Sequence, residues 1–396
     1  MTGNPPDVIY DLIIAGAGPV GLFAGLMAQN AGLKTLLLEK RTAPVTHSRS
    51  IGIHPPSLEL FSDAGILEAF LERGKRIHRG LAHGGHGKLL GILDFDKSGK
   101  PHSYILTIPQ WESETILEKL LTSRDSVTLK RGCTITGISE HAPGPDTIQV
   151  TVTSQNGSTS SFSGRMLLGC DGRNSFVRKY AGIRYQGAPY AGRYAMGDFA
   201  DNTDFQSDAV IFLGKEGLVE SFPLPGSIRR WVIEQDRDHP AAGVPELIDI
   251  IRNRCGVAPE AESCCMFSDF GVEKYLADTF WVRRMLLAGD AAHVVSPIGG
   301  QGMNLGWLNA ADAVHCIRRV LDGSISLDDG SKRYSRLVRS RAKMVADRAE
   351  FNMFLGGKNA MPQVRNSVVR LMLHSPLRHW LRNRFTMQGL KKLHHV

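Results

Sequence analysis

Residues 11–41 read DLIIAGAGPVGLFAGLMAQNAGLKTLLLEKR, and this pattern predicts a buried strand, a helix and a second strand. The turn between the first strand and the helix contains Gly16, Gly18 and Gly21, which have the spacing G-x-G-x-x-G. In such a turn one glycine makes the bend, one lets a pyrophosphate approach the backbone, and one lets the helix lie close to the strand. The stretch therefore predicts a site for an adenine dinucleotide.

The second predicted strand ends at Glu39, eighteen residues after Gly21. A carboxylate in this place can accept hydrogen bonds from ribose hydroxyls, while the amino terminus of the helix faces the phosphates. Val20, Lys40 and Arg41 lie in the same two turns, and we include them in the predicted site.

The amino-acid composition limits the classes of protein to which such a site can belong. The chain has 396 residues, 42% hydrophobic and 22% charged, which is typical of a globular enzyme with room for two domains. The amino-terminal residues resemble no export signal, and no apolar run is long enough to span a membrane. The six cysteines form no C-x-x-C pair, and His83 and His86 stand in a glycine turn, so we expect a cytoplasmic protein without a metal site.

The positive charge is concentrated at the end of the chain. Residues 351–396 contain eight Lys or Arg and no Asp or Glu, and these eight charges equal the net charge of +8. Apolar residues recur there at helical spacing, with Pro376 between two predicted helices. Basic amphipathic helices can dock on an anionic membrane surface. We favour the alternative, in which the helices cover the domain and present a solvated basic face.

Two further loops follow predicted strands, at the edge where an open α/β sheet holds ligands. The first contains Asp171 and the second Asp290, and the second loop continues as PIGGQGMN into a helix. The start of this helix exposes backbone N–H groups that suit a ligand gaining negative charge. The residues that we assign to this turn are Pro297, Gly300, Gly302, Met303 and Asn304.

These motifs, in this order, resemble those of the single-component flavin-dependent monooxygenases typified by para-hydroxybenzoate hydroxylase. The glycine turn with Glu39 is similar to the part of that family that binds the ADP of FAD; Asp171-Gly172, with Ser175 and Arg178, is similar to its Asp-Gly motif, and Gly289-Asp290 to its second FAD motif. Arg49 matches the arginine of the family's mobile-flavin loop, and Gln110 matches a residue beside the flavin. The resemblance covers nearly the whole chain.

The resemblance implies an enzyme that reduces FAD with NAD(P)H, adds O2 to give a C4a-hydroperoxide, and transfers one oxygen atom to a substrate. No second strand–turn–helix unit for a dinucleotide is evident, so NAD(P)H would bind without a Rossmann domain of its own. No side-chain constellation suggests a catalytic acid or base, and we interpret His293 as structural. The basic tail lacks the aromatic platform of a nucleic-acid-binding module.

The resemblance also implies an α/β fold, in which a Rossmann-like FAD-binding domain carries an inserted antiparallel-sheet substrate domain and C-terminal helices. We expect the first domain at 1–74, 108–179 and 276–350, the second at 75–107 and 180–275, and basic helices at 351–396. Aligned by strand pattern, Phe222, Pro223 and Leu224 stand where hydroxylases of small phenolic acids have polar groups, and Arg230 matches an arginine associated with flavin movement. With Pro297, these residues predict an apolar pocket for a fairly large, weakly charged substrate such as a polycyclic compound.

Other functions are compatible with the same motifs. The W-x-W-x-I-P signature of flavin-dependent halogenases is not found. A reductase of the geranylgeranyl type would use the same FAD motifs and an apolar pocket without needing O2, and a non-enzymatic flavoprotein subunit would keep FAD alone. The sequence leaves open hydroxylation, epoxidation or Baeyer–Villiger oxidation, NADH or NADPH, and the oligomeric state.

Overall fold

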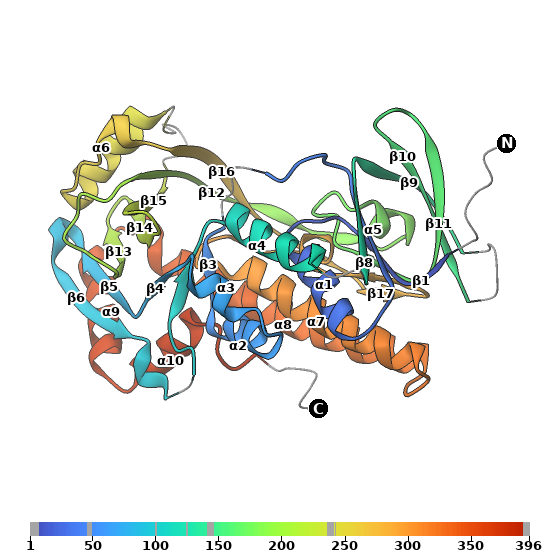
Figure 1. Ribbon diagram of the computed structural model, residues 1–396. Coiled ribbons are helices and arrows are strands. Elements are labelled where there is room, and N and C mark those ends of the chain that lie inside the picture. The colour runs from blue at the N-terminus through green and yellow to red at the C-terminus, as the bar shows by residue number, and fades with distance from the viewer. Residues whose placement is uncertain are drawn as a thin grey trace.

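The molecule is built around two large sheets, and long helices lie along one side of it (Figure 1). This computed structural model describes residues 8–45, 50–99, 101–123, 126–140, 146–235, 241 and 243–390. The described residues form two eight-stranded sheets and one three-stranded sheet. This arrangement confirms the predicted α/β fold with a second, largely antiparallel layer.

The first sheet has the strand order β17-β18-β11-β1-β2-β8, and its strands from β18 to β8 are parallel. Ala15 pairs with Leu38 on one side and Gly169 on the other, and Gly169 pairs with Leu287. The loops with the predicted motifs therefore leave the sheet at one edge. The strands of this sheet are β1 (Ile9–Ala15), β2 (Thr35–Glu39), β8 (Val127–Arg131), β9 (Cys133–Ser139), β10 (Ile148–Ser154), β11 (Thr159–Gly169), β17 (Trp281–Val282) and β18 (Met285–Leu287).

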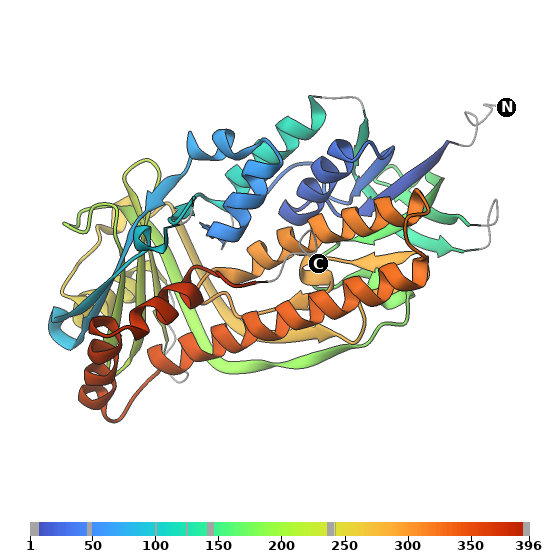
Figure 2. The same ribbon diagram turned by 90° about the horizontal axis from the view of Figure 1, so that it is seen from below.

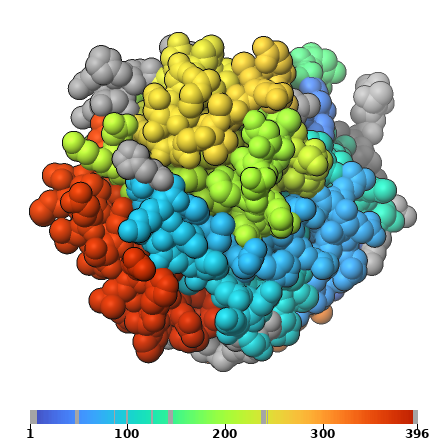
Figure 3. All heavy atoms as spheres, turned by 90° about the vertical axis from the view of Figure 1, so that its left-hand side faces the viewer, coloured from blue at the N-terminus to red at the C-terminus, as the bar shows by residue number. Residues whose placement is uncertain are grey.

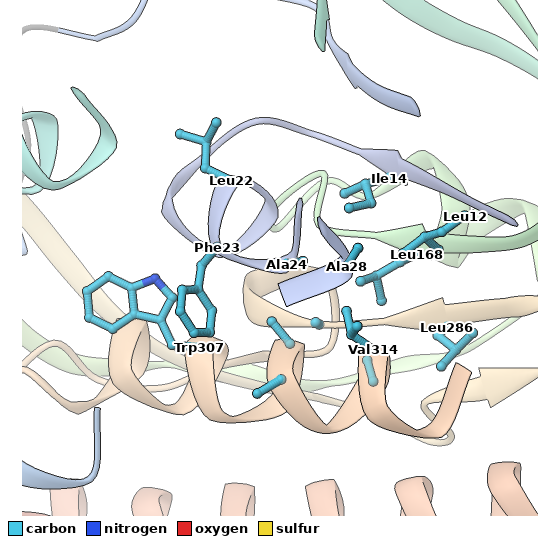
Figure 4. Packing of buried hydrophobic residues seen from close by; sticks show 14 of the residues in the cluster. Leu12, Ile14, Leu22, Phe23, Ala24, Ala28, Leu168, Leu286, Trp307 and Val314 are labelled. Atoms are coloured by element: carbon cyan, nitrogen blue, oxygen red, sulfur yellow. The ribbon is translucent and has the colours of Figure 1, made fainter. Parts of the chain in front are cut away.

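Helices cover the first sheet because their apolar faces need burial. Figure 4 shows Phe23 of α1 beside Trp307 of α7, and the Trp307 indole donates to the Pro19 carbonyl at 3.0 Å. Figure 2 shows that α7 and α8 lie side by side along the molecule. The helices of this half are α1 (Pro19–Asn30), α2 (Pro55–Asp63), α3 (Leu67–Leu71), α4 (Gln110–Thr122), α5 (Phe176–Tyr180), α7 (Gln301–Leu321) and α8 (Leu327–Gly356).

The second sheet has the order β19-β16-β12-β15-β14-β13-β5-β6. All its neighbouring strands are antiparallel except β13 and β5, which are parallel. β12 and β16 extend from this sheet toward the first half of the molecule (Figure 1). The strands are β5 (Arg79–Gly84), β6 (Leu89–Asp94), β12 (Tyr185–Ala200), β13 (Ala209–Gly214), β14 (Gly217–Leu224), β15 (Ile228–Glu234), β16 (Met266–Ala277) and β19 (His293–Val294).

This half also contains a three-stranded sheet of β3 (Gly52–Ile53), β7 (Ile105–Thr107) and β4 (Lys75–Ile77), and the separate helix α6 (Val244–Cys255). The domain boundaries given above stay a prediction. Most strands of the second sheet fall within residues 75–107 and 180–277, whereas β19 lies further along the chain.

The basic C-terminal segment forms α9 (Pro362–His374) and α10 (Leu377–Phe385), which lie against β6 (Figure 3). Arg365 is buried and donates to the carbonyls of Leu213 at 2.6 Å and Gly214 at 2.9 Å. Part of the positive charge thus holds the helices on the second sheet, whereas Val368 and Leu371 are exposed. Within the described ranges, no helix combines the length and apolarity needed to cross a bilayer.

Candidate active site

The three glycines of the first turn are needed for different reasons. Gly16 has φ +95°, and a Cβ there would lie 2.5 Å from the Cys170 carbonyl oxygen. A Cβ on Gly21 would lie 1.8 Å from the Gly16 carbonyl oxygen, so α1 could not begin so close to the turn. At Gly18 an added Cβ would meet no protein atom within 4 Å. Gly16 and Gly21 therefore shape the turn, and Gly18 leaves its outer side open to a ligand.

Glu39 lies at the end of β2 beside this turn. Its carboxylate accepts from the Ala17 amide at 2.7 Å and from the amide and the Nε of Arg41, each at 2.9 Å. Burial opposes ionisation of Glu39, but these hydrogen bonds and the Arg41 charge lower its pKa below the ordinary value. An ionised acceptor is thereby fixed between the glycine turn and the end of the neighbouring strand.

A polar groove of about 570 Å³ runs along this edge of the sheet. Most of the predicted cofactor residues line it, namely Gly16, Gly18, Val20, Glu39, Lys40, Arg41, Gln110, Asp171, Asp290, Pro297, Gly300, Gly302 and Met303. Gly21 and Asn304 do not line the groove, and Arg49 lies outside the described residues. The assignment of these residues to a cofactor stays a prediction.

The Asp171 and Asp290 loops are tied together by Arg178, which donates to the Arg173 carbonyl at 2.7 Å and to the Ala291 carbonyl at 2.9 Å. Asp171 accepts from the amides of Phe176 at 2.7 Å and Val177 at 3.2 Å with one oxygen, and its other oxygen has no hydrogen-bond partner among the described residues. The first carboxylate therefore shapes its own loop.

The Asp290 side chain is exposed to the groove. The protein around it raises its pKa to about 6, although Arg173 lowers this value. Solvent in the groove favours the ionised form of this carboxyl. Asp290 is therefore available to accept from a ligand hydroxyl.

The side chain of Asn304 supports the start of α7. Its amide nitrogen donates to the carbonyls of Gly52 at 2.8 Å and Gly300 at 2.9 Å, and its oxygen accepts from the His54 amide at 2.8 Å. Gly299 and Gly300 have φ of +88° and +66°, which lets the chain enter α7 through a tight bend. Asn304 thus locks this bend against β3.

A second cavity, of about 180 Å³, lies under the second sheet. Its walls are mostly apolar, and its sheet side is formed by inward-facing residues of β13, β14 and β15. The other walls come from β5, the three-stranded sheet and the C-terminal helices, which contribute Val369, Leu373, Leu381 and Phe385. Ser50, Pro297 and Gly300 line both the groove and this cavity, so the two spaces meet at the start of α7.

The predicted substrate residues have different positions relative to this cavity. Phe222 and Pro297 line it, whereas Pro223 and Leu224 do not. Arg230 also lines it, and its buried guanidinium is held by Asp198 in two hydrogen bonds of 2.6 and 2.7 Å. Its role in flavin movement stays a prediction.

Several lining residues were not predicted from the sequence. In the groove these are chiefly Ser50, Cys133, Thr134, Ile135, Asn174 and Phe176. Thr134 and Ile135 belong to β9, which reaches the groove only because the chain folds back beside β2. Gln110 was predicted, and the structure adds that its amide nitrogen is held by Glu114 at 2.8 Å.

His293 lines neither space. It lies 2.7 Å from the Asn309 amide nitrogen, and burial lowers its pKa to about 4. No group of three or more His, Cys, Asp or Glu residues among those described could hold a metal ion.

Comparison with known proteins identifies the class to which this architecture belongs. A family model described as "FAD binding domain" matches residues 10–349, and the chain is a member of that family. The residues of the groove fit this cofactor, because it combines an open glycine turn, an ionised carboxylate at a strand end and an uncapped helix start.

Matches to individual proteins give more specific information than the family model does. The chain is 30% identical over 322 residues to rifampicin monooxygenase of Streptomyces venezuelae, covering 80% of this chain and 65% of that protein. It is 31% identical over 328 residues to 12-dehydrotetracycline 5-monooxygenase/anhydrotetracycline 6-monooxygenase of Streptomyces rimosus, covering 76% of this chain and 61% of that protein. The chain thus spans less than two thirds of the length of these relatives.

A solved structure shows the same fold over its full length. The p-nitrophenol 4-monooxygenase of Pseudomonas putida superposes with a TM-score of 0.85 at 19% identity, over 96% of this chain and 99% of that chain. At this identity the likeness concerns the fold.

Proposed function

We propose that this protein is an FAD-dependent, NAD(P)H-driven monooxygenase that inserts one oxygen atom from O2 into an apolar aromatic or polyketide-type substrate. The observation that carries the proposal is that Ser50, Pro297 and Gly300 line both the groove and the apolar cavity, so a ligand in the groove would lie next to the cavity. A redox group at this junction would have one side in the groove and one side toward a buried organic molecule.

The residues of the chain would bind FAD, orient it and the substrate, and shield the site from water. The glycine turn and Glu39 would hold the nucleotide end of FAD, and Gln110 lines another part of the groove. No side chain among the described residues caps α7, so the N–H groups of Gly302 and Met303 in its first turn are available to stabilise negative charge. FAD bound there and reduced by NAD(P)H would supply the activation of O2.

Exclusion of water supports the same reaction. An activated oxygen species is lost to solvent unless the site is dry. The cavity walls are contributed by buried residues such as Met196, Leu218, Phe270 and Leu381. Such walls favour a substrate with fused or extended apolar rings, in agreement with the antibiotic substrates named for the relatives.

The function is tested by measuring three quantities on one sample. Purified protein is reconstituted with FAD, then NAD(P)H oxidation, O2 uptake and product mass are recorded over a panel of phenolic, polyketide and isoprenoid compounds. We expect substrate-stimulated NAD(P)H oxidation, equal O2 uptake, and a product heavier by one oxygen atom. Turnover that continues without O2 would instead indicate a reductase, and FAD binding without stimulation by any compound would indicate a flavoprotein subunit.

The membrane interpretation is a separate proposal. Since α9 and α10 contribute the inner wall of the cavity, we propose that their main role is to close it rather than to bind lipid.

A further inference from the structure

Glu220 lies in the middle of the apolar wall. It stands on β14 between Leu218 and Phe222, and all three residues face the cavity because alternate residues of a strand share a face. Ile211 is its partner in β13 and Val232 its partner in β15. Only 6% of Glu220 is exposed.

The carboxyl group of Glu220 has no hydrogen bond or ion pair with any other described residue. Two other polar groups of the wall have partners: Thr107 donates to the Pro223 carbonyl at 2.6 Å, and Arg230 is held by Asp198. The Glu220 oxygens are not among the fully buried side-chain atoms that lack a partner, and the residue lines the cavity, so its carboxyl is accessible from there. A carboxyl in an apolar wall is costly unless a donor meets it, and a ligand can supply that donor.

The charged and titratable groups near Glu220 give its carboxyl neither a hydrogen bond nor an opposite charge. Arg230 from β15 faces the cavity with its charge directed to Asp198 of β12, and His54 at the junction is kept neutral, because burial lowers its pKa to about 4. Tyr194 of β12 is influenced by the charge of Glu220, and burial raises the pKa of this phenol above its ordinary value. With no cation opposite it, burial raises the pKa of Glu220 to about 7.

We propose that Glu220 binds the hydroxyl group of a phenolic substrate, accepting its hydrogen bond while the apolar walls hold the ring system. This inference rests on the proposed function and assigns its substrate class. It also gives the site a specificity residue outside the cofactor motifs.

A phenol fits this position better than a cationic amine. Both would give the carboxylate a donor, but an amine would bring a second charge into an apolar cavity, and the cost of removing that charge from water offsets much of the attraction. A neutral phenol gives up only its hydrogen bonds to water. The carboxylate therefore gains a donor without a second buried charge.

The test compares two ligands with the same ring system, one with a hydroxyl donor and one without. Binding of 2-naphthol and of its methyl ether is measured by calorimetry on the FAD-loaded full chain. We expect the wild-type protein to prefer the phenol by about 10- to 100-fold, because the ether leaves the carboxylate without a donor. In Glu220→Leu the preference should fall to within about twofold.

Ile211→Val is the matched control, since Ile211 lies opposite Glu220 and lines the same wall. It should weaken both ligands together and keep their ratio. Glu220→Gln serves if the leucine variant does not fold. Its phenol affinity should be independent of pH between 6 and 8, whereas in the wild-type protein the affinity should rise as the carboxyl ionises.

Three results would overturn the inference: an unchanged phenol-to-ether ratio in Glu220→Leu, a phenol affinity that still rises with pH in Glu220→Gln, or tighter binding of 2-naphthylmethylammonium than of 2-naphthol to the wild-type protein. FAD content and NAD(P)H oxidation are recorded on the same samples. A protein that discriminates the two ligands through Glu220 but consumes no O2 refutes the proposed monooxygenase activity and leaves the phenol site in place.

Discussion

The polar groove and the apolar cavity meet at Ser50, Pro297 and Gly300, but they are built in different ways. The groove is formed by backbone at the ends of adjacent parallel strands, with glycine turns that bring chain segments into contact. The cavity is formed by side chains from two sheets and three C-terminal helices. Binding in the groove should therefore depend on backbone shape, whereas selectivity in the cavity should depend on individual side chains.

The largest effect is expected in the groove. Gly21→Ala places a methyl group against the Gly16 carbonyl oxygen, and we expect a loss of more than about 4 kcal/mol in the free energy of unfolding, measured by denaturant titration of the apoprotein. Gly18→Ala is the control, because it meets no protein atom. It should change apoprotein stability by less than about 0.5 kcal/mol while weakening FAD binding. Equal destabilisation by both variants would contradict the separate roles of these glycines.

The second largest effect is expected when the buried ion pair in the wall of the cavity is broken. Asp198→Asn removes the charge opposite Arg230, and we expect a loss of about 3 kcal/mol, seen as a lower melting temperature. Arg252→Gln breaks the exposed pair with Asp249 and should cost less than about 0.5 kcal/mol. If the two variants melted alike, the Arg230 pair would not contribute to the wall.

A third prediction concerns pH. The pKa of Glu220 rises from 4.5 to about 7 on folding, so its stabilising contribution is complete below pH 4.5 and is lost as the pH rises through 7. Between pH 5 and 8 the wild-type apoprotein should lose up to about 3 kcal/mol relative to Glu220→Gln. The pKa values of His54 and His293 are lowered to about 4, so both histidines destabilise the folded protein as the pH falls below 6.5. This effect is the same in the wild-type protein and in Glu220→Gln, so it cancels when the two proteins are compared. A flat difference would show that Glu220 is solvated in the cavity.

The smallest effect is expected on the outer face of α9. Leu371 is 68% exposed, so Leu371→Ser should change stability by less than about 0.5 kcal/mol, whereas Leu373→Ser, at a residue 7% exposed and lining the cavity, should cost more than about 2 kcal/mol. Flotation with anionic vesicles tests the membrane alternative on the same proteins. Binding by the wild-type protein that is lost in Leu371→Ser would favour lipid docking.

The groove could be predicted from the sequence because its parts are local. The glycine spacing, the strand ending at Glu39 and the loops at Asp171 and Asp290 each lie within one short segment, and parallel strands bring their carboxyl ends to one edge. Asn304 also lies at the predicted helix start, and the structure adds that its side-chain amide holds β3; its contact with the cofactor stays a prediction.

The cavity could be predicted only in part. Strand alternation places Phe222 on an apolar face and also places Glu220 there, but nothing in the sequence indicates that this carboxyl lacks a partner among the described residues. The inner walls from α9 and α10 could not be foreseen, since a helical pattern identifies an apolar face without identifying what that face covers. The parallel pairing of β13 with β5 likewise joins segments more than a hundred residues apart.

The packing of α9 and α10 on β6 has a consequence for biosynthesis. The glycine turn has all its contacts once the chain has been made as far as α7, whereas the cavity lacks Leu381 and Phe385 until α10 has been added. A nascent chain leaving the ribosome would thus complete the nucleotide groove first and would expose the apolar face of its second sheet until the last two helices arrive. Arg365, which bonds two carbonyl groups of β13, would then fasten those helices over that face.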